Sequence, residues 1–173
     1  LRMQLAVSKV SELTDGGFQD VIDEIEPLDP TSIRRVLLCS GKVFYDLLVN
    51  RNERVIDNVA IVRIEQLYPF PADELRRVLA KYPADAEIDW VQEESYNAGA
   101  WSFVEPRLRA ILGTDRAVRY VGRDEGASPA TGSYKLHQHE LDQLLNEAFR
   151  KVTEAPAKQR RQHVGRGTST AAR

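Results

Sequence analysis

The chain has 173 residues, of which 42% are hydrophobic and 29% are charged, and its formal net charge is -2. This composition is typical of one globular domain with a hydrophobic core, and the weak negative charge argues against nucleic acid or an anionic membrane as the main partner. No apolar run approaches the roughly 18 residues of a membrane-spanning helix, and the single cysteine, Cys39, excludes an internal disulfide.

The first 32 residues are polar and irregular. The turn formers Asp15-Gly16-Gly17 and Asp29-Pro30 interrupt this stretch. Helical spacing is shared by four apolar residues, Phe18, Val21, Ile22 and Ile25. A short helix and a loop held against the core are both consistent with this spacing. Because the chain begins with Leu1 and has no signal-peptide pattern, we interpret residues 1–32 as a connector from an upstream domain of a longer polypeptide.

A regular alternation of strands and helices begins near Arg34. Continuous apolar or β-branched runs predict strands over residues 36–39, 59–64, 88–91 and 118–121. Helical periodicity predicts helices over residues 43–48, 73–82, 103–112 and 136–149, with Pro106 starting or kinking the third of these. The connections are too long for hairpins. The sequence therefore predicts an α/β domain over residues 33–150, with three layers and a mostly parallel sheet covered by helices on both faces.

The last segment, residues 151–173, differs in composition from the rest. It contains six Lys or Arg residues, one Glu and almost no large apolar side chains. Such a segment buries too little surface to offset its ordering entropy, so we predict a disordered basic tail. Binding of this tail to RNA or another acidic surface is an alternative.

The stretch Trp90–Trp101 is the most unusual part of the sequence. A short apolar run leads into the adjacent carboxylates Glu93 and Glu94, followed by Asn97, Ala98, Gly99 and Ala100. The two carboxylates could form a general acid/base pair. Neighbouring side chains on a strand point to opposite faces, however, which favours a structural or interface role.

Other polar motifs give weaker predictions. Ser40-Gly41-Lys42 lies between a strand and a helix, where backbone N–H groups can bind phosphate, but it lacks the pattern of a phosphate-binding loop. The loop Ser128–Ser133 is an ordered surface loop or packs across a subunit interface, and Ser133 could cap the final helix. The histidines and Cys39 lack metal-ligand spacing, so we predict no metal site, and Cys39 is predicted to be a small core residue.

Several of these motifs together resemble one family. They are Leu1-Arg2 with Ala6-Val7-Ser8, the run Arg34–Leu48, the run Val59–Pro71, the stretch Trp90–Trp101, and Tyr120–Arg123 with Ala127–Gly132. In this order they resemble the C-terminal region of the thiamine diphosphate-dependent 2-oxoglutarate dehydrogenase component, from Leu1 to about Phe149. The resemblance implies a transketolase-like C-terminal domain, with one antiparallel strand at an edge of the sheet. It departs from the family at Ser95, where proline is usual, and at Ala98, where glutamine or methionine is usual.

The resemblance also implies a function. The full enzyme would decarboxylate 2-oxoglutarate on thiamine diphosphate and magnesium in the citric acid cycle. It would then transfer the succinyl unit to a lipoyl group on a partner acyltransferase. The cofactor motif is absent here, so this segment would bind neither cofactor and carry no catalytic residue, and would instead stabilise the homodimer. The implied location is the bacterial cytoplasm or the mitochondrial matrix.

Two sets of site residues are predicted, the first from the residues themselves and the second from the resemblance. The structural or interface set consists of Glu93, Glu94, Asn97, Gly99, Trp101, Ser128, Pro129 and Gly132. Relatives bind acetyl-CoA as a regulator, and the matching set here consists of Arg2, Ser40, Gly41, Lys42, Gln66 and Arg123. Ala72-Asp73-Glu74 replaces a basic cluster of those relatives, which predicts weaker binding of an anionic ligand. A stand-alone module that binds a nucleotide or acetyl-CoA and the same domain of a 2-oxoadipate dehydrogenase are the alternatives.

Overall fold

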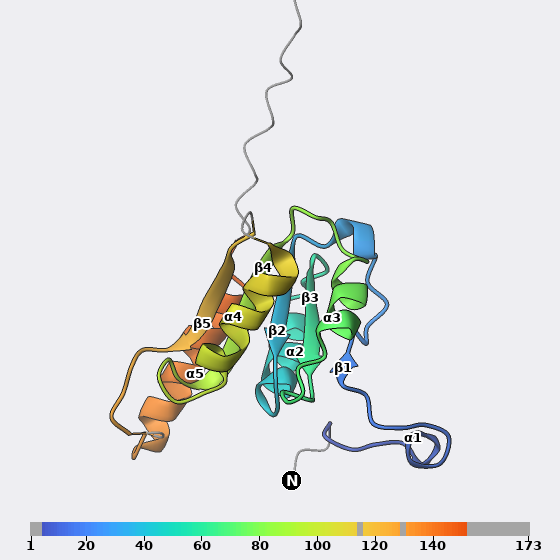
Figure 1. Cartoon of the computed structure of the whole chain (residues 1–173). Coiled ribbons are helices and arrows are strands. Elements are labelled where there is room, and N and C mark those ends of the chain that lie inside the picture. Colours follow the sequence, from blue (N-terminus) through green and yellow to red (C-terminus); the bar gives the residue numbers. More distant parts are fainter. Residues whose placement is uncertain (1–4, 114–115, 129–130, 152–173) are drawn as a thin grey trace, which may run out of the picture.

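An open five-stranded sheet with helices on both faces forms the body of the molecule (Figure 1). The computed structural model of the chain describes residues 5–113, 116–128 and 131–151. Along the sheet the strand order is β1-β3-β2-β4-β5, and β1 pairs with β3 in antiparallel orientation while the other pairs are parallel. The strands are β1 (Val21–Ile22), β2 (Arg35–Cys39), β3 (Val59–Ile64), β4 (Glu87–Ser95) and β5 (Val118–Arg123). The predicted α/β class and its antiparallel edge are confirmed.

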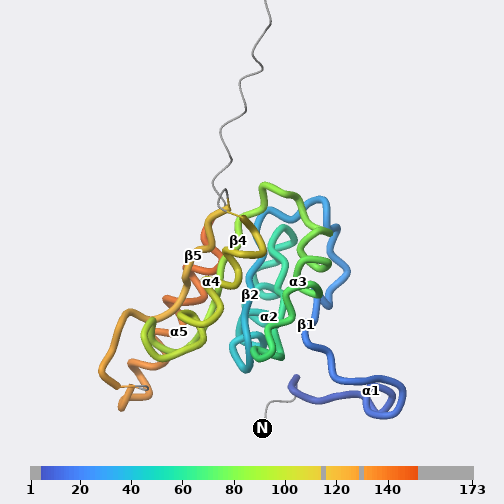
Figure 2. The backbone as a smooth tube through the Cα atoms, in the orientation of Figure 1, coloured from blue at the N-terminus to red at the C-terminus, as the bar shows by residue number. Residues whose placement is uncertain are grey.

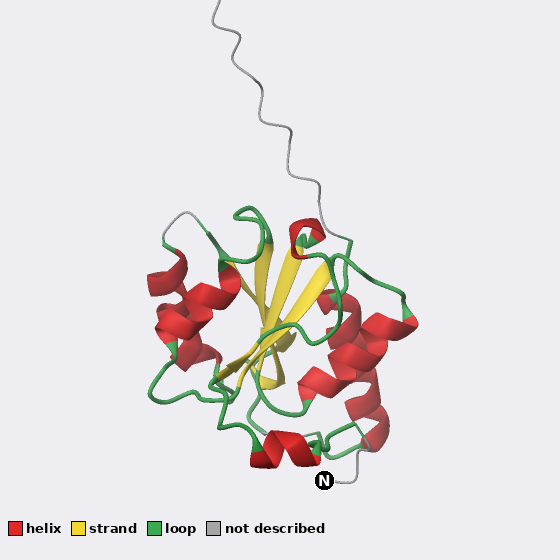
Figure 3. Ribbon diagram, turned by 90° about the vertical axis from the view of Figure 1, so that its right-hand side faces the viewer, coloured by secondary structure: helices red, strands yellow, loops and turns green. Residues whose placement is uncertain are grey.

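The helices lie in two layers, one against each face of the sheet (Figure 3). One layer contains α3 (Ala72–Leu79) and α4 (Trp101–Leu112), and the other contains α2 (Val43–Glu53) and α5 (Tyr134–Ala148). The short elements α1 (Val10–Thr14) and η1 (Pro30–Ser32) lie outside these layers, as the backbone trace shows (Figure 2). The predicted three-layer arrangement is therefore confirmed.

Strand β2 shows why this sequence needs helices on both sides. All five of its residues are buried. Val36 and Leu38 belong to the core cluster under α3 and α4, whereas Leu37 and Cys39 belong to the cluster under α2 and α5. Side chains alternate along a strand, so a continuous apolar run fills both cores at once.

The segment after Asp15 does not form the short helix that is one of its two predicted forms. The helical spacing of Phe18, Val21 and Ile25 does not produce a helix here, because Val21–Ile22 is the edge strand β1. Val21 pairs with Ile64, and the carbonyl oxygen of Asp20 accepts from the nitrogen of Glu65 at 2.9 Å. Backbone pairing with the exposed edge of β3 outweighs the local helical pattern, and only Val21 of the apolar set is buried.

Two carboxylates hold the chain after β1 against the domain. Glu24 forms a bidentate pair with Arg51, with N–O distances of 2.5 and 2.8 Å, and its Oε2 also accepts from the nitrogen of Ile61 at 2.7 Å. Asp23 accepts from the hydroxyl of Tyr82 at 2.5 Å and from Lys81 at 2.7 Å. Arg51 is 1% exposed, so its charge is desolvated and depends on this partner.

Some predicted boundaries shift. Strand β4 continues to Ser95 rather than ending at Val91. Helix α4 begins at Trp101, so Pro106 lies inside the helix and does not start it. Ser133 precedes α5, but its side chain makes no capping hydrogen bond. These boundaries depend on packing at the ends of the elements. The spacing of apolar residues in the sequence does not predict that packing.

Candidate functional site

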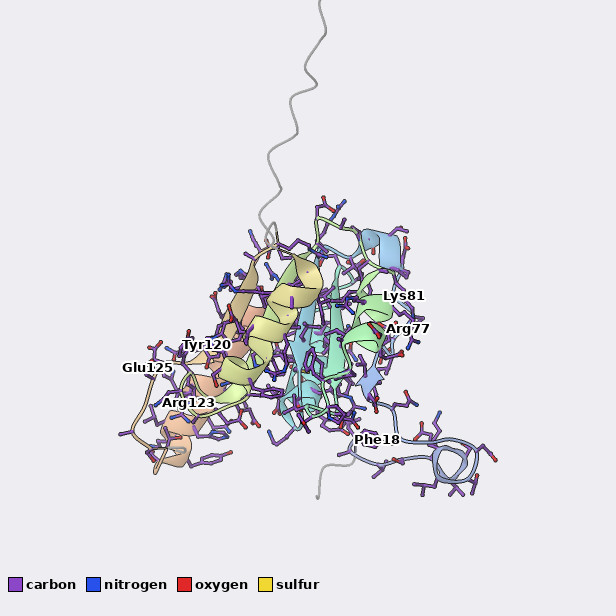
Figure 4. The ribbon with its side chains drawn as sticks, in the orientation of Figure 1. Phe18, Arg77, Lys81, Tyr120, Arg123 and Glu125 are labelled. Carbon is purple, nitrogen blue, oxygen red and sulfur yellow. The ribbon has the colours of Figure 1, made fainter. Side chains whose placement is uncertain are left out.

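The carboxyl ends of the parallel strands place most of the predicted site residues at one edge of the sheet. Ser40–Lys42 follow β2, Gln66 follows β3, Glu93 and Glu94 lie near the end of β4, and Arg123 ends β5. Figure 4 shows Arg123 at the end of β5 with Glu125 just beyond it. In open α/β sheets this edge is the usual place for ligands and functional groups.

The residues predicted to bind a regulatory ligand are only partly brought together. Lys42 Nζ lies 3.3 Å from Glu93 Oε1, and Arg123 and Glu93 line the same small pocket. Gly41 has a φ of +73°, a left-handed conformation that favours glycine in this turn. Gln66 instead donates to the carbonyl oxygen of Pro69, its own loop, at 3.0 Å. Arg2 lies outside the described residues.

The charges at this edge are balanced by carboxylates. Lys42 Nζ contacts Asp46 Oδ2 at 2.5 Å as well as Glu93, and Arg123 Nε lies 3.0 Å from Glu140 Oε2. Burial alone would lower the pKa of Lys42, but Asp46 and Glu93 raise it above its ordinary value. An anionic ligand would therefore compete with three carboxylates for two cations. This balance weighs against strong phosphate binding at the edge.

The predicted interface residues fall into different environments. Glu93 is half-buried against Lys42, whereas Glu94 is exposed, as strand alternation predicts. Asn97 ties two loops together, because its side chain both donates to and accepts from the backbone of Gly126, each at 3.1 Å. Ser128 and Gly132 are exposed on the loop before α5, and Pro129 lies outside the described residues.

A buried glutamine that the sequence reasoning missed organises the stretch Trp90–Trp101. Gln92 is 3% exposed, and its Oε1 accepts from Trp90 Nε1 at 2.9 Å and from the backbone nitrogen of Trp101 at 3.0 Å. Its Nε2 donates to the carbonyl oxygen of Ser95 at 3.1 Å. A Cβ added to Gly99 would lie 2.5 Å from Gln92 Cδ. Glycine is thus required at position 99 by close packing. Gln92 follows the predicted strand 88–91 and precedes two carboxylates, so its burial has no local signal in the sequence.

An aromatic cluster packs beside this glutamine. The ring centroids of Tyr96 and Tyr120 are 4.9 Å apart, and those of Trp101 and Tyr120 are 5.4 Å apart. The hydroxyl of Tyr120 donates to the carbonyl oxygen of Arg123 at 2.8 Å, and burial raises the pKa of Tyr120 to about 12. Trp101 is 8% exposed and anchors the start of α4. The phenol of Tyr120 therefore stays neutral at physiological pH, and the cluster fixes the end of β5 beside β4.

A second buried polar group lies at the opposite, amino edge of the sheet. Arg35 is fully buried and donates to Glu87 Oε2 at 2.6 and 2.8 Å, and its Nε lies 3.5 Å from Asp89. It also donates to the carbonyl oxygens of Ala148 and Arg150, at 3.0 and 2.8 Å. One guanidinium therefore joins β2, β4 and the end of α5. The residues come from distant parts of the chain, so no local motif signals the group.

Cys39 and the histidines form no metal centre in the described part of the chain. Cys39 is fully buried in β2, and burial raises the pKa of its thiol, as expected of a core residue. His137 and His139 are both exposed on α5, and His137 lines the small pocket beside Arg123. Among the described residues, no group of three or more His, Cys, Asp or Glu could hold a metal ion. Within the same residues, no helix is both long and apolar enough to cross a membrane.

Comparison with known proteins identifies what this arrangement is similar to. A family model described as 2-oxoglutarate dehydrogenase C-terminal matches residues 7–149, which include the whole sheet. The chain is 47% identical over 151 residues to the 2-oxoglutarate dehydrogenase E1 component of Coxiella burnetii. It is 44% identical over 149 residues to the protein of the same name from Haemophilus influenzae.

The chain corresponds to a small part of these relatives. Each alignment covers 86% of the chain but only 16% of the Coxiella burnetii or Haemophilus influenzae protein. The same shares hold for the oxoglutarate dehydrogenase of Buchnera aphidicola, which is 43% identical over 149 residues. The chain therefore spans about a sixth of the length of the curated relatives that it matches.

Proposed function

The chain belongs to the 2-oxoglutarate dehydrogenase C-terminal family, and we propose that it is the C-terminal domain of an enzyme that oxidatively decarboxylates 2-oxoglutarate. The observation that carries this proposal is the family match over residues 7–149, which coincides with the folded α/β domain. The names of the relatives support 2-oxoglutarate, rather than 2-oxoadipate, as the substrate of the whole enzyme.

In this proposal the domain supports the enzyme and does not itself perform the reaction. Thiamine diphosphate and magnesium supply the decarboxylation chemistry elsewhere in the longer polypeptide, and a lipoyl-bearing acyltransferase accepts the succinyl unit. In this proposal we assign no catalytic step to this segment. Its surfaces would contribute to a homodimer, in the bacterial cytoplasm or the mitochondrial matrix.

The contacts described above explain how the domain could serve as a rigid support. Gln92 and the aromatic cluster of Tyr96, Trp101 and Tyr120 fix the carboxyl edge, and Arg35 fixes the amino edge. Buried polar groups that are fully hydrogen-bonded make one arrangement much more stable than its alternatives. A surface built on these elements keeps its shape when another part of the enzyme packs against it.

Activity measurements test the proposal directly. The purified 173-residue chain, supplied with thiamine diphosphate, magnesium and 2-oxoglutarate, should release no carbon dioxide above the rate without protein. The full-length polypeptide should be active, and deletion of residues 7–149 should abolish both its activity and its dimer in sedimentation experiments. Turnover by the isolated chain, or an active dimer after the deletion, would contradict the proposal.

A regulatory role for Ser40, Gly41, Lys42, Gln66 and Arg123 is a separate prediction. The carboxylates that pair with Lys42 and Arg123 weigh against it. Isothermal titration of the chain with acetyl-CoA and with AMP distinguishes the possibilities. Saturable binding that Lys42→Met weakens would support a regulatory module. If neither ligand gives a binding heat, only the supporting role of the domain remains.

A further inference from the structure

The charges of this chain are divided unevenly between its folded domain and its basic tail, residues 151–173. Residues 1–150 contain 18 Lys or Arg and 25 Asp or Glu residues, a formal charge of -7. The tail contains six Lys or Arg residues and one Glu, a formal charge of +5. The family match ends at residue 149, so membership of the family does not explain the charge of the tail. Of the tail, the structure describes only Lys151.

A groove of about 620 Å³, which we call the acidic groove, lies between the end of β5 with its following loop and one side of α5. Among the residues that line it, Arg123 is the one cation and four are carboxylates, Asp124, Glu125, Glu140 and Glu147. Glu140 pairs with Arg123, and Glu147 pairs with Arg119 of β5. Asp124 and Glu125 are exposed, and neither has a salt-bridge partner in the described part of the chain. Two carboxylates of the acidic groove are therefore available to cations from outside it.

The basic tail begins beside the acidic groove. Glu147, at one end of the groove, is only four residues before Lys151. From Glu147 the groove follows α5 back to Glu140, a distance of about 10 Å along the helix axis. Arg160 is nine residues beyond Lys151, and an extended stretch of that length spans up to about 30 Å. If the tail turns back along α5, its basic residues therefore reach the far end of the groove.

A second depression near Lys151 suits the tail less well. It has a volume of about 380 Å³ and lies at the amino edge of the sheet, where Arg150 is part of its lining. The charged residues that line it are three carboxylates and three arginines, Asp85, Glu87, Asp89, Arg116, Arg119 and Arg150. Arg35 also pairs with two of these carboxylates from the interior. This depression has no excess negative charge to attract a basic segment, whereas the acidic groove has.

We propose that the basic tail docks in the acidic groove of its own domain, with Arg160 and Arg161 paired to Asp124 and Glu125. A guanidinium group suits this role because it binds a carboxylate through two parallel hydrogen bonds. A tethered segment also meets its site at an effective concentration on the order of 1 mM, which a separate molecule rarely reaches. RNA is the less favourable partner, because the domain's charge of -7 repels a polyanion. The proposal goes beyond the proposed function and does not depend on it.

Zero-length crosslinking of the full-length polypeptide tests the proposal. A water-soluble carbodiimide joins an amine to a carboxylate only where the two are in contact, and Lys158 lies two residues before Arg160. A mixture of nitrogen-15 and unlabelled protein separates crosslinks within one polypeptide from crosslinks between copies. We expect Lys158 to couple to carboxylates of the acidic groove at least fivefold more than to any other carboxylate of the domain. This coupling should fall at least fivefold between roughly 50 mM and roughly 500 mM salt, because salt screens exposed charges. Coupling chiefly elsewhere on the domain, only between copies, or not at all would overturn the proposal.

Limited proteolysis gives a second readout that does not depend on activity. Asp124→Asn combined with Glu125→Gln removes the two available carboxylates of the groove at exposed positions. Asp73→Asn combined with Glu74→Gln is the matched control, because these adjacent carboxylates lie on α3 in the opposite helix layer. Trypsin cleavage after Arg161 in the full-length polypeptide should accelerate at least threefold in the groove variant and stay unchanged in the control. Equal cleavage rates in the two variants and the wild type would show that the tail is not held in the groove.

Binding of a labelled 20-nucleotide RNA distinguishes the other partner class. RNA must displace the groove carboxylates from a docked tail, so the groove variant should bind RNA at least threefold more tightly than the control variant in fluorescence anisotropy. RNA binding that is equally tight in both variants, and that abolishes the coupling of Lys158, would make nucleic acid the partner of the tail and overturn the proposal. Each of these outcomes is independent of whether the enzyme decarboxylates 2-oxoglutarate.

Discussion

The side-chain oxygen of Gln92 lies 3.0 Å from the backbone nitrogen of Trp101 and joins strand β4 to the first residue of helix α4. The same oxygen accepts from Trp90 Nε1 at 2.9 Å. Helix α4 begins without a side-chain cap on its preceding residue, so Gln92 supplies an acceptor for one of the N–H groups at the start of the helix. The turn between the two elements is therefore set by a buried side chain and not by its own sequence alone.

Replacement of Gln92 should be costly. Gln92→Leu leaves two buried N–H donors without their acceptor, and each unsatisfied donor costs roughly 1–3 kcal/mol. We expect the free energy of unfolding to fall by about 3 kcal/mol in urea denaturation. The control is Gln143→Leu on the exposed face of α5, which should change stability by less than about 0.5 kcal/mol. Equal stability of the two variants would show that the Gln92 hydrogen bonds are not needed.

Gly99 should not tolerate a methyl group. A Cβ at this position would lie 2.5 Å from Gln92 Cδ and 2.6 Å from Gln92 Oε1, which is far inside normal contact distance. Gly99→Ala must displace the buried glutamine, so we expect destabilisation by about 1–3 kcal/mol, measured by thermal or urea unfolding. Gly17→Ala is the matched control, because a Cβ there meets nothing within 4 Å. A Gly99→Ala protein as stable as the control would refute this account.

Arg35 and Asp89 should behave as a coupled pair. Arg35→Met leaves Asp89, which is 1% exposed, with less compensation, and loss of one partner of a buried pair costs about 3–5 kcal/mol. Adding Asp89→Leu should restore part of this loss, giving a coupling energy of about 1–3 kcal/mol in a double-mutant cycle. The exposed pair Arg76 and Asp73 should give less than about 0.5 kcal/mol in the same experiment. Additive effects at Arg35 and Asp89 would contradict the prediction.

Asp23 should contribute to the acid sensitivity of the fold. Burial alone would raise the pKa of Asp23, but hydrogen bonds from Lys81 and Tyr82 hold it below its ordinary value. A carboxyl with a lowered pKa in the folded state stabilises the protein fully above its unfolded pKa. That contribution is lost as the pH falls through the folded pKa. We therefore expect the free energy of unfolding of Asp23→Asn to decline less steeply than that of the wild type between about pH 5 and about pH 2.

A second variant makes the acid prediction specific. Tyr82→Phe removes the hydroxyl that donates to Asp23 at 2.5 Å but keeps the ring. Its stability curve should lie between those of the wild type and Asp23→Asn, because the bond from Lys81 remains. Urea unfolding at a series of pH values measures all three curves. Parallel curves for the three proteins would show that Asp23 does not contribute in this pH range.

The strands and their burial could be predicted from the sequence to a large extent. Val36–Cys39 and Val59–Ile64 are continuous apolar or β-branched runs, and such runs require cover on both faces wherever they lie in the fold. The alternation of strands with helices then favours a parallel sheet. The family could also be predicted, because several ordered motifs carry it and the match over residues 7–149 confirms it.

The candidate site was predicted less completely. The alternation of Glu93 and Glu94 follows from strand geometry, but the pairing of Lys42 with Asp46 and Glu93 does not. The two ends of the Lys42–Glu93 contact are 51 residues apart in sequence. Which carboxylate neutralises which cation depends on the order of the strands, and that order is a property of the assembled sheet.

The sequence by itself determined the periodic elements, the class of fold and the family, because these follow from local patterns of apolar residues and from ordered motifs. Only the tertiary structure decided that Val21–Ile22 is a strand, since the unpaired edge of β3 stabilises that backbone and the local helical spacing does not. It also decided the roles of Gln92 and Arg35, whose partners are brought together by folding. A buried polar group is stable only when it is hydrogen-bonded to a partner. How far apart two residues lie in the sequence does not determine how far apart they lie in the folded protein.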